Sequence, residues 1–146
     1  MNVRVVVADE REANFFDVAK PQSPPQARGS LRNQGARPDR ELETDRPGRR
    51  FGGSDGNRHA VDGERSTERH AMELFAKEVA QTLEGARTRH EFDRLVLVAG
   101  PRMLGLLREA LSEPCRSVVA AEVAKDLVHH DPAAIRDSVP RAAFLH

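Results

Sequence analysis

The order of hydrophobic and polar positions along the chain predicts both strands and helices. Residues 2–8 and 14–18 are strand-like apolar runs separated by the polar turn 9–12, a pattern that predicts a β-hairpin. Residues 94–100 form a nearly continuous apolar run, as expected of a strand covered on both faces. Residues 115–123 predict a further buried strand. These runs predict a sheet of about four strands, with the run 94–100 in its interior.

Helical periodicity predicts the elements that cover this sheet. From about Ser66 to Arg87, apolar residues recur at steps of three and four along one face, which predicts a long amphipathic helix. Pro101 suits the first turn of a helix that runs to about Leu111. Asp131 and the proline after it form an N-cap and first turn for a short helix over residues 133–139. Strands alternating with helices predict an α/β fold, a mixed β-sheet flanked by helices.

Residues 20–63 depart from these patterns. They hold most of the chain's glycines and prolines, few sizeable apolar side chains and an excess of arginine. We therefore expect one α/β domain over residues 1–146, carrying a mobile insert at 20–63 that is a long disordered Gly/Pro/Arg-rich loop. We expect no strand in this insert, and so an exposed sheet edge that a partner or a homodimer contact would cover.

Composition narrows the class of protein. The chain has 23 Lys+Arg and 23 Asp+Glu, so a polybasic coat for nucleic acid is excluded, and without Trp or Tyr an aromatic platform for stacked bases is not expected. The single Cys115 forms no intramolecular disulfide and lies in an apolar run, so we expect a small buried core residue in a reducing compartment. With no signal peptide or membrane-spanning run, we expect a cytoplasmic protein. The histidines lack metal-ligand spacing, so no metal site and no cofactor are predicted.

Arginine and glycine gather in residues 46–60, RPGRRFGGSDGNRHA, ahead of the long helix. Glycine allows close backbone approach, and arginine offers paired donors to phosphate, so this segment is a candidate RNA or phosphate site. It matches neither common nucleotide-binding glycine pattern, and a flexible charged connector remains the alternative. The candidate residues are Arg46, Arg49, Arg50, Gly52, Gly53, Ser54, Arg58 and His59.

A second set of polar residues follows the predicted strands. Lys125 and Asp126 come just after the last strand, and Asp9 and Arg11 come just after the first. If these strands are parallel, the four residues share one rim of the sheet, where ligands of open α/β sheets gather. The rim is either a polar site or an internal ion pair that locks the strand ends together.

Four segments resemble the bacterial host-attachment protein family: VVVADEREANFF (5–16), DRPGRRF (45–51), residues 69–112 and AEVAKDLVHHDPAAI (121–135). That family is in turn similar to the middle domain of archaeal and eukaryotic peptide-release factors, so the resemblance implies an RNase H-like sheet arrangement. Release factors carry a Gly-Gly-Gln loop ahead of a long helix. Here Gly52 and Gly53 lie in a comparable place, with Ser54 at the glutamine position.

The residues and the resemblance together predict a non-catalytic binding domain, with no catalytic residue assigned. The resemblance implies association with the translation apparatus, with the ribosome or tRNA as partner, and the arginine-rich segment would contact its phosphates. Any role in host attachment would be indirect, and no membrane partner is expected. Two alternatives remain: a hydrolase acting on peptidyl-tRNA or a related ester, and a direct surface adhesion factor.

Overall fold

The computed structural model describes the backbone of residues 1–35 and 53–145, and the side chains of residues 1–35 and 67–145. The strands are β1 (Val3–Ala8), β2 (Glu12–Val18), β3 (Gln26–Arg32), β4 (Arg94–Ala99) and β5 (Val119–Ala124). The helices are α2 (Gly53–Thr88), α3 (Pro101–Ala110), α4 (Glu113–Ser117), α5 (Pro132–Ser138) and the 3-10 helix η2 (Arg141–Phe144). The helix starts expected at Pro101 and after Asp131 are confirmed, and the Asp131 side chain accepts a hydrogen bond from the Ala134 N–H at 3.0 Å.

The strands form one mixed sheet in the order β3-β2-β1-β4-β5. The predicted hairpin is confirmed, because β1 and β2 pair antiparallel from Val3 opposite Val18 to Ala8 opposite Ala13. β1, β4 and β5 run parallel to one another, and β4 lies inside the sheet as its apolar run predicts. The α/β class is therefore confirmed, and the carboxyl ends of three parallel strands meet at one edge.

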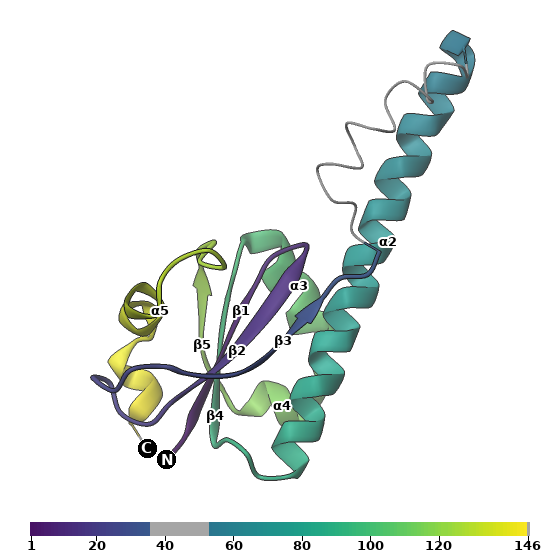
Figure 1. The fold of residues 1–146 in the computed structure, drawn as a ribbon. Helices are drawn as coiled ribbons and strands as arrows, with labels where there is room; N and C mark the ends of the chain where they lie inside the picture. Colours follow the sequence, from purple (N-terminus) through teal and green to yellow (C-terminus); the bar gives the residue numbers. More distant parts are fainter. Residues whose placement is uncertain (36–52, 146) are drawn as a thin grey trace.

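Helices cover both faces of the sheet (Figure 1). Alternation along β1 sends Val6 to one hydrophobic core, shared with α2, α3 and α4, and Val5 to the other, shared with α5. Phe75 of α2 and Leu107 of α3 are fully buried in the first core, and Ile135 of α5 is buried in the second. β1 is therefore buried on both faces, and the sheet lies between two layers of helices.

β3 corrects the expectation that residues 20–63 contain no strand. It pairs antiparallel with β2, and a bulge at Phe15 and Phe16 leaves Arg28 as the extra residue on the β3 side. Only Leu31 packs against a core, so the strand has no apolar face for a sequence pattern to reveal. Its pairing comes from backbone hydrogen bonds at the sheet edge. β3 covers the edge of β2 that was expected to be exposed, which removes the reason given for a homodimer contact there.

α2 begins earlier than its apolar periodicity predicts. The predicted helix starts near Ser66, whereas the helix starts at Gly53. The added turns hold only Ala60 and Val61 as apolar residues, so they show no stripe that a periodicity argument could detect. No helix in the described part of the chain is both long enough and apolar enough to cross a membrane.

The predicted strand over residues 115–123 is correct only in its second half. Cys115 lies in α4, not in a strand, although its predicted burial is confirmed. Ser112 is the N-cap of α4, and its Oγ accepts a hydrogen bond from the Cys115 N–H at 3.2 Å. Pro114 occupies the first turn. Capping chemistry therefore starts a helix where apolar content alone suggests a strand.

Candidate functional site

A pocket of about 290 Å³ lies at the carboxyl ends of β1, β4 and β5. Its polar lining includes Asp9, Glu10 and Arg11 from the β1–β2 turn, Arg102 from α3 and Asp126 from the segment after β5. Three of the four residues expected on one rim therefore meet at one pocket. Lys125 is exposed and is not part of the lining.

Asp9 also shapes the turn that places it. Its Oδ1 accepts hydrogen bonds from the backbone N–H groups of Arg11, at 2.7 Å, and Glu12, at 2.8 Å. The Asp9 N–H donates to the carbonyl of Glu12 at 2.9 Å, closing the turn. One carboxylate oxygen is therefore committed to local structure, as is usual for aspartate in turns. This geometry gives Asp9 a structural role at the rim of the pocket.

The carboxylate of Asp126 differs from that of Asp9. Within residues 1–35 and 67–145, neither Asp126 nor Lys125 takes part in a hydrogen bond or ion pair through its side chain. The alternative of an ion pair that locks the strand ends is therefore not what these two residues form in the described parts of the chain. Asp126 instead lines the pocket with a carboxylate that has no partner among the described side chains.

The pocket is also lined by residues that the sequence analysis did not assign to a site. Met72 of α2 and Met103 of α3 are almost fully buried and supply apolar surface. Gly100 and Pro101, at the start of α3, also line the pocket, and a Cβ at Gly100 would meet no atom within 4 Å. Gly100 and Pro101 follow β4 directly. The rule that ligands gather at the carboxyl ends of parallel strands, which pointed to Lys125 and Asp126, could therefore have found them as well. The lining mixes charged and apolar groups, as small-molecule pockets do.

The arginine- and glycine-rich candidates lie largely outside the described residues. These are Arg46, Arg49, Arg50 and Gly52. Gly53, Ser54, Arg58 and His59 lie in the first turns of α2, where the backbone alone is described. Their proposed role in phosphate or RNA binding stays a prediction.

An ion-pair cluster lies at the opposite end of β1 from the pocket. Arg4 of β1 donates to its cross-strand neighbour Asp17 through Nε at 2.5 Å, and Arg28 of β3 donates to the same carboxylate at 2.7 Å. The Arg4 guanidinium also lies 5.4 Å from the centre of the Phe92 ring. Burial would raise the pKa of Asp17, but the hydrogen bonds from Arg4 and Arg28 outweigh burial and lower it. The cluster therefore joins β2 and the edge strand β3 to β1 in the interior of the sheet.

A second cluster links α2 to α4. Glu84 of α2 accepts hydrogen bonds from Arg87 and from the Ser112 hydroxyl, and these two donors lower the pKa of Glu84 to about 2. Burial, followed by the nearby Glu84 charge, raises the pKa of the Cys115 thiol. Both effects disfavour the thiolate, so we expect Cys115 to be an unreactive core thiol. Within the ranges that the structure describes, no three His, Cys, Asp or Glu side chains lie close enough together to hold a metal ion.

Comparison with known proteins gives the family. A family model described as "Protein required for attachment to host cells" matches residues 4–139, nearly the whole chain. The protein named "Uncharacterized protein RP470" of Rickettsia prowazekii (strain Madrid E) is 37% identical over 71 residues. That match covers 47% of this chain and 45% of the relative, so the chain spans less than half of the relative's length. The match over residues 4–139 shows that the chain belongs to the family of proteins required for attachment to host cells.

Proposed function

We propose that this host-attachment-family protein is a non-catalytic, cytoplasmic binding module of the translation apparatus. In this proposal, residues 46–59 contact phosphates of ribosomal RNA or tRNA, and the effect on host attachment is indirect. The observation that carries the proposal is the N-terminal part of α2, which continues well past the sheet. The proposal also draws on the resemblance of the family to the middle domain of release factors.

The first residue of α2 that is buried in the described part of the helix is Met72. Between Gly53 and that point the helix is about 28 Å long, at 1.5 Å per residue. Figure 1 shows this part of α2 extending beyond the sheet, and residues 67–70 on it are all exposed. A helical arm whose sequence carries no apolar stripe adds little to the folding of the core.

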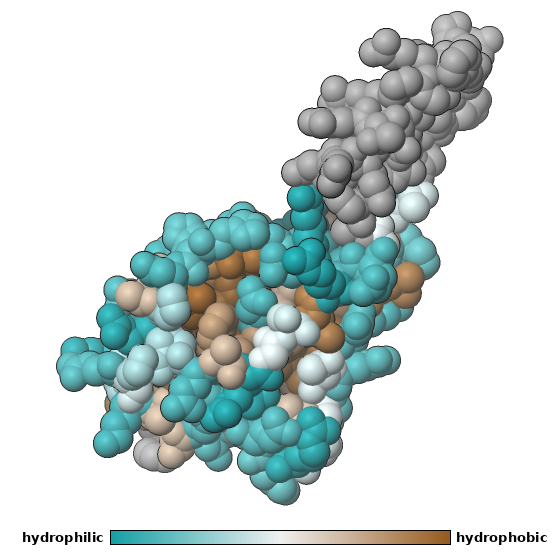
Figure 2. All heavy atoms as spheres, in the orientation of Figure 1, coloured by the Kyte–Doolittle hydropathy of each residue, from teal (hydrophilic) through white to brown (hydrophobic). Residues whose placement is uncertain are grey.

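The chemistry next to this arm favours a partner rich in phosphate. Arg46, Arg49 and Arg50 precede the helix, and guanidinium groups form paired hydrogen bonds with phosphate oxygens. In the described parts of the chain, the large apolar residues that are exposed are Met1, Leu74 and Leu145, which lie on α2 and at the two ends. Figure 2 shows a mostly hydrophilic face with apolar side chains in separate patches. Charge is therefore the favoured basis for a contact.

Cosedimentation with ribosomes across a salt series tests the proposal. We expect wild-type binding to weaken steeply with salt, and the Arg49→Ala/Arg50→Ala variant to lose affinity and about 1.4–1.8 units of the log–log salt slope. The matched control is Arg32→Ala/Lys77→Ala, which removes the same charge from exposed sites on β3 and on the packed half of α2. Absence of binding at low salt, or an equal loss in the control, would refute the proposal.

Two further assays separate the alternatives. Hydrolysis of a model peptidyl-tRNA by the wild type but not by Gly53→Ala would show that the protein is a hydrolase and not a binding module. Digestion of the native protein on intact cells by an external protease would show that it is a surface adhesion factor. We expect neither result.

A further inference from the structure

We propose that a second hollow, on the α5 side of the sheet, binds the phosphate group of a small phosphate monoester. This hollow of about 380 Å³ lies between the β2–β3 connection and the segment from α5 to η2. Pro21 and Gln22 line it from one side, and Arg136 and Arg141 from the other. The site shares no residue with the pocket at the carboxyl strand ends or with the α2 arm.

Buried residues anchor the backbone that carries the two arginines. Ile135 and Ala143 are 2% and 0% exposed, and Val139 between them is 9% exposed and also lines the hollow. Arg136 follows the first of these anchors, and Arg141 opens η2. These three residues anchor the backbone of the segment from α5 to η2 to the core, so the positions from which both arginine side chains reach the hollow are fixed. Little backbone ordering is then needed when a ligand is bound.

The hydrogen-bonding groups of the hollow are mostly donors. The Arg136 Nε lies 3.4 Å from Oδ1 of Asp137, whose side chain is 71% exposed, so this ion pair is long and solvated. Arg141 has no hydrogen bond or ion pair with any residue that the structure describes. Gln22 adds a side-chain amide. Unused guanidinium donors at a fixed hollow point to an anionic ligand.

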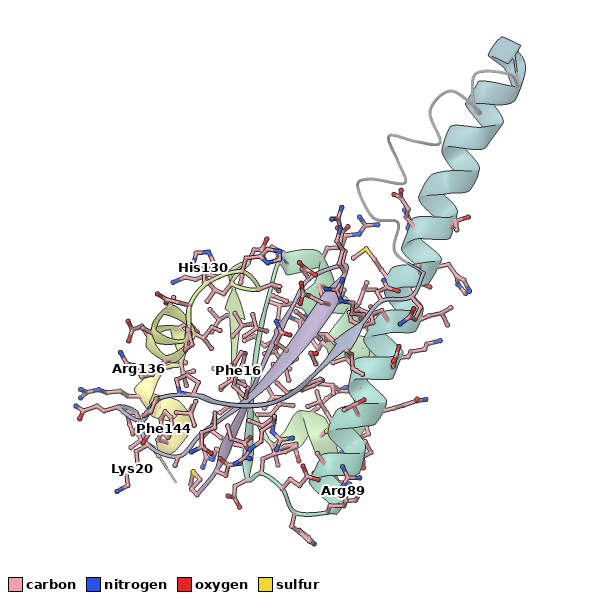
Figure 3. All side chains as sticks on the ribbon, viewed as in Figure 1. Phe16, Lys20, Arg89, His130, Arg136 and Phe144 are labelled. Carbon is pink, nitrogen blue, oxygen red and sulfur yellow. The ribbon has the colours of Figure 1, made fainter. Side chains whose placement is uncertain are left out.

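Charge and size favour a phosphate monoester over a carboxylate. Arg136 and Arg141 outnumber Asp137, and Lys20, next to Pro21 in the chain, adds a positive charge. Figure 3 shows Lys20 and Arg136 on the side of the protein that carries α5. A monoester dianion matches this excess of positive charge better than a single carboxylate does. The volume lies within the range of small-molecule pockets and leaves space for an organic group beyond the phosphate.

NMR titration of the intact chain tests the site, with inorganic phosphate and adenosine monophosphate as probes at constant ionic strength. We expect saturable shifts of the Gln22 side-chain amide and of the amides of residues 136–143, with tighter binding of the nucleotide. Arg141→Gln and Arg136→Gln should each weaken binding about tenfold, because each removes charge-assisted hydrogen bonds. Arg32→Gln, on the exposed β3 strand, should bind as the wild type does.

Several results would overturn the assignment. One is a response that does not saturate, and another is an equal response to acetate. A third is unchanged affinity in both arginine variants when their spectra show the native fold. If adenosine monophosphate binds no more tightly than inorganic phosphate, the assignment of a phosphate monoester as the ligand is wrong. None of these outcomes depends on ribosome binding, so failure here is distinct from failure of the proposed function.

Discussion

The buried pair of Arg4 and Asp17 allows a quantitative test of the fold. Their side chains are only 7% and 9% exposed, so Asp17→Asn leaves the Arg4 guanidinium buried without its nearest counter-charge. Removing one partner of a buried ion pair costs about 3–5 kcal/mol of unfolding free energy. For a chain of this length, that loss corresponds to a fall in Tm of about 6–20 °C. Urea unfolding followed by circular dichroism measures the change directly.

Two companion variants sharpen this test. Glu122→Gln removes the partner of Arg108 in an exposed ion pair between α3 and β5, so its unfolding midpoint should change little. Arg4→Met/Asp17→Leu replaces both buried charges with apolar groups and should recover most of the stability lost in Asp17→Asn. If Asp17→Asn costs less than about 1 kcal/mol, the value typical of an exposed pair, the desolvated geometry of Arg4 and Asp17 is wrong.

Three further changes have defined outcomes. Glu84→Gln should lower the unfolding midpoint at neutral pH. The pKa of Glu84 is lowered from 4.5 to about 2 in the folded chain, so its charged form stabilises the fold. The difference in midpoint between wild type and Glu84→Gln should therefore be complete above pH 4.5 and vanish as the pH falls to about 2. Urea titrations at several pH values measure it, and a difference that is independent of pH would contradict it. Cys115 should resist a thiol reagent until the protein unfolds, since burial raises its pKa; labelling at the rate of a free thiol in native buffer would show that the thiol is accessible. Asp131→Ala removes the N-cap of α5 and should cost about 1 kcal/mol in chemical unfolding, whereas Asp131→Asn, which keeps a capping oxygen, should cost less.

Several parts of the fold follow from local sequence because local chemistry decides them. The apolar alternation on either side of residues 9–12 specifies the hairpin of β1 and β2. The continuous run at 94–100 specifies an interior strand, since a strand buried on both faces has no polar side. Pro101 and Asp131 mark the starts of α3 and α5, because a fixed φ angle and a capping carboxylate act within one turn.

The parts that local sequence did not predict depend on contacts between distant segments. β3 pairs through its backbone with β2, and its side chains stay exposed, so no hydrophobic period reveals it. The first turns of α2 also carry no apolar stripe, so hydrophobic periodicity does not reveal them either. Cys115 is the exception, because Ser112 and Pro114, which start its helix, lie within three residues of it and act locally.

The candidate sites divide in the same way. The sequence by itself determined that Asp9 and Asp126 each follow a strand, because strand ends can be recognised from hydrophobic runs. Only the tertiary structure decided that β1, β4 and β5 are parallel, which brings these two carboxylates and Arg102 to one pocket. The meeting of Gln22 with Arg141 across the second hollow depended on the tertiary structure as well. A site of this kind depends on where non-adjacent segments meet, and that is set by sheet order and core packing over the whole chain.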